Sequence, residues 1–354
     1  MANDRHDVDY IIVGQGLAGT CLAYALLKRN QKIFVVDTGN GEQCSAVAVG
    51  GYNPLAFRTF SPTWKAAEIV PEARDFYLEI GRLIKSELVN DRSILKVISN
   101  NDQKKLWLQK SEKTVSSQFM QHELLTKYKG IKADFGLGKV LQSGNINMPE
   151  LLGNFRTFLK SSNCLMEIRF DKNDLQLNDS GLIYKNIHAK GLIFCEGHEA
   201  SENYYFSNLP FKKTKGEVII IECVGLDMDD IMHNKINIVP LGNDLYWVGS
   251  TYEWQDLELK TTKAARLNLE SQLLETLKLP FKIIDQKVGI RPTVKDRRPV
   301  LGKHPDHSQL FIFNGLGTRG VMLGPHFSIQ FCSFLLDGEK PDREVDYLRF
   351  SESK

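Results

Sequence analysis

The chain has 354 residues, which is long enough for two lobes that share a large core. Its 45 Lys and Arg residues nearly balance 43 Asp and Glu residues, which argues against a protein covered by a nucleic-acid-binding surface. The six cysteines show no CxxC spacing, and this favours reduced thiols over a disulfide framework or a metal site. No apolar run could cross a bilayer and the first residues lack the apolar core of a secretory signal, so we expect a cytoplasmic protein without a membrane partner.

The stretch from Asp9 to Asp37 predicts a strand, a glycine-rich turn, a helix and a second strand. Tyr10–Val13 is a short uncharged run, as expected for a central parallel strand that is covered on both faces. It leads into a GxGxxG motif, whose glycines allow a tight turn, a close approach of backbone to a pyrophosphate, and packing of the helix on the strand. The expected cofactor contacts here are Gly14, Gly16, Leu17, Ala18 and Gly19.

The acidic residue at the end of this stretch narrows the choice of cofactor. Asp37 follows the predicted strand Lys32–Val36, where a carboxylate would accept hydrogen bonds from ribose hydroxyls. An acid at this place disfavours a 2′-phosphate and therefore NADP. FAD and NAD both remain open from this stretch alone.

The middle of the chain predicts helices and strands around a run of small residues. The run ends in Gly50-Gly51, and its small side chains would let a flat group lie against the backbone. Helices are expected at 64–88, 113–128 and 149–159. A hairpin is expected from the segments 165–170 and 175–177, which a polar four-residue turn joins.

The second half of the chain returns to the first sheet and then departs from it. Residues 189–197 predict a strand that ends in glycine, as at the ligand edge of an open α/β sheet. Antiparallel strands are expected at 216–222, 235–239, 245–250 and 283–290, with a helix at 261–277. A strand at 310–313, a glycine-rich turn at 314–320 and a helix at 321–336 follow. The first lobe is therefore discontinuous.

Six motifs in this order resemble the D-amino-acid oxidase and glycine oxidase family of FAD-dependent oxidoreductases. They are GQGLAG with Asp37, SAVAVGGYNP, IFCEG, KGEV, GIRPTVKDRRPVLG and GLGTRG, and together they cover nearly the whole chain. The resemblance implies an α/β fold in which a Rossmann-like FAD-binding domain carries a second, antiparallel-sheet substrate domain. We expect the FAD-binding domain at 1–80, 135–210 and 290–354, and the substrate domain at 81–134 and 211–289.

The resemblance also implies where a non-covalently bound FAD would lie. The small-residue run would pass behind the isoalloxazine ring, and the turn from Gly315 to Gly320 would close over the pyrimidine edge of the flavin. The helix that starts there would direct its positive end toward N1 and the C2 carbonyl. The implied contacts are Ser45, Ala48, Gly50, Gly51, Gly197, Gly315, Gly317, Thr318, Arg319, Gly320 and Val321.

Arg291, in the GIRP motif, is the candidate substrate-binding residue. The resemblance implies that its planar guanidinium holds a substrate carboxylate over the flavin. The competing interpretation is a salt bridge to a surface acid such as Asp296. The implied reaction is oxidation of the CH–NH bond of a carboxylate-bearing amine or amino acid by hydride transfer to flavin N5, followed by hydrolysis of the imine.

Two departures from the family pattern leave the substrate open. Asn237 stands where family oxidases often carry an active-site tyrosine, so it is a candidate pocket residue and glycine-like specificity is in doubt. Thr318 makes the last turn resemble the oxidase domain of the bifunctional enzyme that removes a carboxymethyl group from the tRNA wobble uridine.

Three functions therefore compete at this point. We favour oxidation of a free small-molecule amine or amino acid. The first alternative is a tRNA side-chain oxidase, for which Lys212, Lys213 and Lys215 are a candidate basic cluster. The second alternative is a flavin-binding protein without catalysis.

Overall fold

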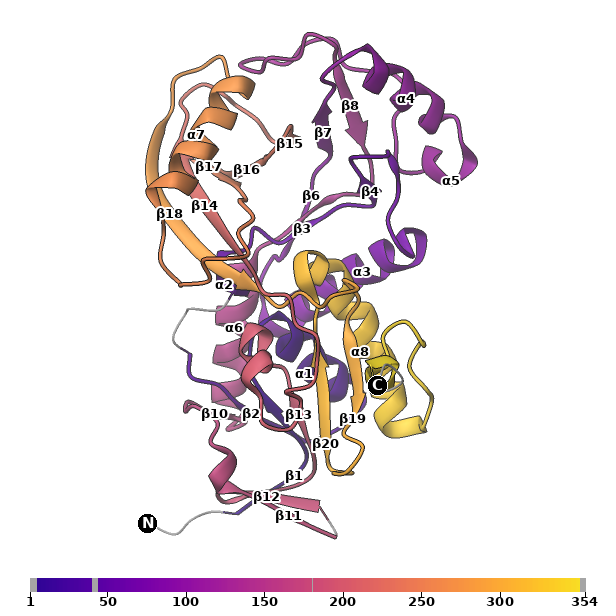
Figure 1. Cartoon of the computed structure of the whole chain (residues 1–354), viewed down its shortest axis with the longest axis vertical. Coiled ribbons are helices and arrows are strands. Elements are labelled where there is room, and N and C mark those ends of the chain that lie inside the picture. The colour runs from indigo at the N-terminus through magenta and orange to yellow at the C-terminus, as the bar shows by residue number, and fades with distance from the viewer. Residues whose placement is uncertain (1–4, 40–43, 180, 351–354) are drawn as a thin grey trace.

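The computed structural model describes residues 5–39, 44–179 and 181–350, which form two lobes (Figure 1). The first lobe is built on an eight-stranded sheet, here called the first sheet. In it β1 lies between β2 and β13, β13 also pairs with β20, and all these neighbours are parallel. Its strands are β10 (Leu165–Met166), β2 (Ile33–Val36), β1 (His6–Val13), β13 (Ile187–Phe194), β12 (Gly181–Tyr184), β11 (Leu175–Asn178), β20 (Leu310–Asn314) and β19 (Val300–Lys303).

Both faces of the central strands are buried, which explains their continuous apolar sequence. Ile12 and Val35 pack on one face with residues of four helices. Ile11 and Phe34 pack on the other face with residues that include Phe206 and Tyr347. A parallel strand covered on both sides shows no apolar–polar alternation. The four helices are α1 (Leu17–Lys28), α3 (Ala66–Ile84), α6 (Met148–Ser161) and α8 (Gly320–Asp337).

The second lobe contains a seven-stranded sheet, here called the second sheet, in which every neighbouring pair except β15 with β7 is antiparallel. Leu269 and Leu273 of α7 (Lys263–Thr276) pack on one face of it. The opposite face carries Val218 and Trp247. In sheet order the strands are β18 (Lys282–Arg291), β14 (Thr214–Glu222), β17 (Leu245–Gly249), β16 (Asn237–Gly242), β15 (Ile231–His233), β7 (Ile94–Val97) and β8 (Leu137–Val140).

Short elements connect the two lobes. Helix α2 (Cys44–Val47) precedes the strands of a three-stranded and a two-stranded small sheet, and helices α4 (Asn101–Ser111) and α5 (Thr114–Ser117) flank the second lobe (Figure 1). The small sheets consist of β3 (Gly51–Tyr52), β9 (Gly144–Ile146) and β6 (Val89–Asp91), and of β4 (Leu55–Ala56) with β5 (Ser61–Pro62). Among the described residues, no helix is both long and apolar enough to cross a membrane.

The strand pairing bears on the expected division into domains. β8 pairs with β7 in the second sheet, although the expected boundary at residue 135 would place β8 in the other domain. We propose that the substrate domain extends through Val140. The first residue of β14, Thr214, pairs with the last residue of β18, Arg291, and this end of the two strands lies at the junction of the lobes (Figure 1).

The helix expected at 113–128 is wrong. Helix α4 begins earlier, at Asn101, because the Asn100 side chain accepts a hydrogen bond from the Gln103 N–H and caps it. It ends at Ser111, and α5 covers only Thr114–Ser117. The remainder of the expected helix runs beside β8 and hydrogen-bonds to its backbone, so tertiary contacts outweigh local helix preference there.

The hairpin expected from 165–170 and 175–177 is also wrong. β10 pairs in parallel with β2, and β11 pairs instead with β12, which follows it. β10 comes directly after α6, and a strand that follows a crossover helix returns parallel to the sheet. The polar turn at 171–174 therefore separates two parts of the first sheet and does not close a hairpin.

Candidate active site

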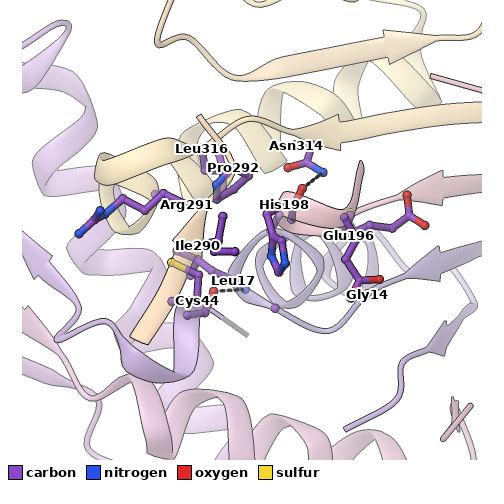
Figure 2. A pocket seen from close by; sticks show the side chains of 18 of the residues that line it. Gly14, Leu17, Cys44, Glu196, His198, Ile290, Arg291, Pro292, Asn314 and Leu316 are labelled. Atoms are coloured by element: carbon purple, nitrogen blue, oxygen red, sulfur yellow. Dashed lines mark hydrogen bonds between the residues drawn. The ribbon is translucent and has the colours of Figure 1, made fainter. Parts of the chain in front are cut away.

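A cavity of about 970 Å³ is lined by residues of both sheets (Figure 2). This volume is at the upper end of the range for small-molecule and cofactor sites, about 300–1,000 Å³. Among the residues expected from the sequence, those that line it are Gly14, Gly16, Leu17, Ala18, Asp37, Ser45, Ala48, Gly50, Gly51, Gly197, Asn237, Arg291, Gly317, Thr318, Gly320 and Val321. Gly19, Gly315 and Arg319 do not line it.

The first glycine-rich turn requires glycine for close packing. Gly14 has a φ of +100°, and a Cβ there would lie 2.6 Å from the carbonyl oxygen of Cys195. A Cβ on Gly19 would lie 1.8 Å from the carbonyl oxygen of Gly14, so Gly19 serves packing of α1 on the turn. The N-cap residue of α1, Gly16, offers no side-chain cap, and the first turn has no acidic residue; the Leu17 N–H donates to Ser45 Oγ at 3.1 Å. The positive end of α1 is therefore not neutralised by an acid and suits an anion.

Asp37 lines the cavity at the end of β2, and its carboxylate accepts hydrogen bonds from two backbone groups and from a side chain. The backbone N–H groups of Gln15 and Gly39 donate to it at 2.8 Å each, and Arg156 Nη1 donates to its Oδ1 at 2.7 Å. Arg156 lies on α6 and also bonds to Glu167 at 3.0 Å. Sequence reasoning missed Arg156, because nothing in its local pattern indicates a partner 119 residues away.

A second glycine-rich turn joins β20 to α8, whose first residue, Gly320, lies against Leu17 of α1. Gly315 and Gly317 have φ values of +74° and +57°, a left-handed conformation that favours glycine. Asn314 donates to the Gly197 carbonyl at 3.1 Å and accepts from the Gly315 N–H at 2.7 Å, which ties the turn to the end of β13 (Figure 2). Helix α8 then begins at Gly320 without a side-chain cap or an acidic residue in its first turn.

Arg291 projects from the end of β18 into the cavity without an acidic partner among the described residues. Its guanidinium donates to Ser250 Oγ and, at 3.4 Å, to the Thr251 carbonyl, and it lies 4.7 Å from the centre of the Tyr252 ring. The side chain passes directly over Gly216, where a Cβ would come within 2.2 Å of Nη2.

The competing salt bridge to Asp296 is not formed. Asp296 pairs with Arg349 at 2.8 Å, and neither residue lines the cavity. Arg291 is thus a cation whose described neighbours are hydroxyl, carbonyl and aromatic groups. A partly buried charge without a counter-charge is costly unless a ligand supplies one.

Glu196 is a cavity residue to which sequence reasoning assigned no separate role. It follows β13 and precedes Gly197, and Asn203 donates to its Oε2 at 2.7 Å. Burial raises the pKa of Glu196 to about 7, against the opposing effect of the Asn203 hydrogen bond. Figure 2 shows Glu196 and Arg291 on opposite sides of the cavity.

The lysines proposed as a basic cluster do not form one. The side chain of Lys215 is only 1% exposed and bonds to Asp256 at 2.8 Å. Lys213 pairs with Glu202 at 3.1 Å. Of the three, Lys212 is the exposed one; it precedes β14, whereas Lys215 is buried within that strand.

Comparison with known proteins assigns the chain to a family. The sequence model of the FAD dependent oxidoreductase (DAO) family matches residues 9–328. The chain belongs to this family.

Relatives and solved structures agree with the assignment. A tRNA 5-methylaminomethyl-2-thiouridine biosynthesis bifunctional protein from Idiomarina loihiensis is 22% identical over 98% of this chain, which spans 58% of that protein. Glycine oxidase from Geobacillus kaustophilus is 23% identical over 90% of both chains, and its crystal structure aligns over 96% of this chain and 97% of that one with a TM-score of 0.76. Iminodiacetate oxidase from Chelativorans sp. BNC1 aligns over 95% and 98% with a TM-score of 0.76 and 17% identity.

The protein is therefore an FAD-dependent oxidoreductase with a Rossmann-like fold, and its cavity fits that cofactor. The uncapped start of α1 suits the pyrophosphate, and the uncapped start of α8 suits a partial negative charge on the flavin. A Cβ on Gly197 would meet no atom within 4 Å, so this position opens directly onto free space. The small residues of the 45–51 run line the same cavity as the short helix α2 and strand β3.

Proposed function

We propose that this family member oxidises the CH–NH bond of a carboxylate-bearing amine or amino acid, and that Arg291 binds the carboxylate. The observation that carries the proposal is the Arg291 guanidinium in the cavity, with no acidic partner among the described residues. A carboxylate would supply the missing counter-charge and could accept two parallel hydrogen bonds from the planar group.

The chain's own residues would mainly bind and orient the substrate. Ser250 and Thr251 hold the guanidinium from one side, so its position is set before a ligand enters. Fixing the carboxylate also restricts the orientation of the adjacent C–H bond, which lowers the entropic cost of reaching a reactive geometry. FAD, when bound, supplies the hydride acceptor at N5. Glycine oxidase and iminodiacetate oxidase, by their names, also act on amines that bear carboxylates.

Anaerobic reduction of the flavin tests the proposal. The panel comprises glycine, sarcosine, D-amino acids, proline and iminodiacetate, and bleaching of the flavin absorbance is followed for the protein and for Arg291→Ala. Loss of about two charge-assisted hydrogen bonds should lower kcat/KM by about 10³-fold. The matched control is Arg29→Ala, because Arg29 pairs with Asp337 on the surface and should leave the rate unchanged. Equal reduction of Arg291→Ala would disprove the assignment.

A tRNA-borne amine is the second candidate, and an exposed aromatic pair favours it. Tyr252 and Trp254 are 54% and 61% exposed and stack with ring centres 6.2 Å apart, and Tyr252 lines the cavity beside Arg291. Such a pair could stack on a nucleobase. Retention of tRNA at low salt that weakens as salt rises, and weakens further in Tyr252→Ala, would support this candidate. No retention at low salt would exclude it.

A further inference from the structure

Arg291 and Asn237 line one face of the second sheet at a distance from each other. The Arg291 guanidinium lies over Gly216, whereas Asn237 lies in the row formed by Val218, Gly249 and Asn237. Gly216 and Val218 are two residues apart on β14, and Asn237 is two strands away from β14. With strand spacings of about 4.8 Å and about 3.3 Å per residue, Asn237 lies on the order of 12 Å from the position of the guanidinium.

The space between these two residues is narrow and apolar. Gly249 lies between them and is covered by the side chains of Val218 and Trp247, since a Cβ there would lie 2.7 Å from Val218 Cγ1 and 2.9 Å from Trp247 Cη2. Both of these side chains line the cavity that contains Arg291 and Asn237. The Trp247 indole donates to the Val47 carbonyl at 3.0 Å, which fixes this wall against α2. A flat or slender apolar segment therefore fits between the two polar ends.

The Asn237 side chain has one side-chain hydrogen bond among the described residues. His233, directly opposite it on β15, places Nδ1 2.7 Å from Asn237 Oδ1. The His233 ring is stacked on Phe57, with ring centres 4.0 Å apart and an angle of 20° between planes. These contacts fix the ring, and the ring in turn restrains the amide.

His233 is neutral at pH 7. Burial and, to a smaller extent, the charge of Lys96, its neighbour on β7, lower its pKa to about 4, although the hydrogen bond to Asn237 opposes this shift. A neutral imidazole carries one N–H, and a contact between Nδ1 and an amide oxygen requires that hydrogen on Nδ1. The NH₂ group of Asn237 then points away from His233.

We propose that His233 positions Asn237 with its NH₂ toward the cavity, and that the site selects carboxylate-bearing amines with a second hydrogen-bond acceptor about 10 Å from the carboxylate. The inference rests on the proposed function of Arg291. Glycine and sarcosine are too short to reach both residues, whereas an amine with an apolar segment and a carbonyl or carboxylate beyond it reaches both. His233 is a positioning residue here, because it acts only through Asn237.

The tautomer of His233 tests the positioning step without any turnover. In the holoenzyme labelled with ¹⁵N-histidine, the His233 signals are those that disappear in His233→Phe. We expect a neutral ring with the hydrogen on Nδ1 at pH 7. A hydrogen on Nε2 would overturn the proposal, because Nδ1 would then accept from the Asn237 NH₂ and the amide oxygen would face the cavity.

A matched substrate pair tests the selectivity. N-(4-acetylbenzyl)glycine and N-(4-ethylbenzyl)glycine have the same flat middle segment and differ in the terminal acceptor. We expect the acetyl compound to reduce the flavin with about tenfold higher kcat/KM, as one hydrogen bond implies. This ratio should fall to near one in Asn237→Leu and in His233→Phe, with no further fall in the double variant.

The control is His122→Phe, a histidine outside the cavity that hydrogen-bonds to Ser111 at 2.8 Å, and it should keep the ratio. A ratio that persists in His233→Phe would overturn the positioning role. If sarcosine reduces the flavin but neither benzyl compound does, the second acceptor site is disproved. If no carboxylate-bearing amine reduces the flavin, the proposed function fails, and the tautomer result stands apart from that failure.

Discussion

The two sides of the cavity differ in how their charged residues are satisfied. On the side of the first sheet, Asp37 forms a salt bridge with Arg156 and accepts hydrogen bonds from two backbone N–H groups. On the side of the second sheet, Arg291 has no acidic partner among the described residues. Asp37 on the first side has its counter-charge within the protein, whereas Arg291 on the second side requires a ligand to supply one.

This difference suits a cofactor that stays bound and a substrate that must leave. Groups that are already paired hold the cavity in one shape, so little is reorganised when the cofactor binds. A partly buried cation without a counter-charge has an unfavourable desolvation free energy, which a bound carboxylate offsets. The site therefore favours negatively charged substrate groups. Four substitutions can break or sharpen the comparison.

The largest effect is expected on the first side, from Gly19→Ala. The added Cβ would overlap the Gly14 carbonyl at 1.8 Å, so α1 must shift and the turn must open. We expect loss of bound flavin and destabilisation by about 3 kcal/mol or more, measured by the ratio of flavin to protein absorbance and by thermal unfolding. Gly153→Ala, in α6 with no atom within 4 Å, is the matched control and should stabilise by up to about 1 kcal/mol.

Arg291→Lys should affect the second side alone. Lysine keeps the charge but cannot form two parallel hydrogen bonds from one planar group, so kcat/KM for a carboxylate-bearing amine should fall by about 10–100-fold. Flavin content should not change, because Arg291 projects from the second sheet. Stopped-flow flavin reduction and the absorbance ratio measure both quantities. A parallel loss of flavin would show that the two sides are not separable.

Arg156→Met removes the counter-charge of Asp37. The Asp37 side chain is 8% exposed, so loss of this counter-charge should cost about 2–3 kcal/mol of stability and weaken flavin retention by about tenfold. Urea unfolding and flavin fluorescence report the two effects. Adding Asp37→Asn should restore part of the stability. The control is Lys160→Met. Lys160 lies on the same helix as Arg156 and forms an exposed salt bridge with Glu167, so its loss should cost less than about 0.5 kcal/mol of stability.

The smallest effect is expected from Glu196→Gln and depends on pH. Because the pKa of Glu196 is raised from 4.5 to about 7 in the folded protein, the unfolded chain releases this proton first, and stability falls as pH rises between these values. In Glu196→Gln this fall in stability should be absent. Relative to the parent, its free energy of unfolding should be about 2 kcal/mol higher at pH 8 and nearly the same at pH 4.5. Thermal unfolding across this range measures it. Glu112→Gln, an exposed carboxyl, should keep the pH dependence of the parent.

The first lobe was largely predictable because its signals are local. The run from Tyr10 through the glycines to Asp37 follows the structure of β1, α1 and β2 closely, since burial on both faces and glycine geometry leave direct marks on sequence. The helix expected at 113–128 failed in the second lobe, where much of this segment lies along β8. Within the first lobe, the hairpin after Leu165 failed because β10 pairs with the distant strand β2. Local propensity is a weak guide once such pairing competes with it.

The sequence by itself determined the family, the cofactor and the nucleotide-binding turn, because each rests on motifs of glycines and apolar residues that are each contiguous in the sequence. Only the tertiary structure decided which charges remain unpaired. Asp37 forms a salt bridge with Arg156 of α6, and Asp296 forms one with Arg349. Asn237 hydrogen-bonds to His233 on the neighbouring strand. Whether a charged or amide side chain is free to bind a ligand depends on such long-range partners, and no local pattern reveals them.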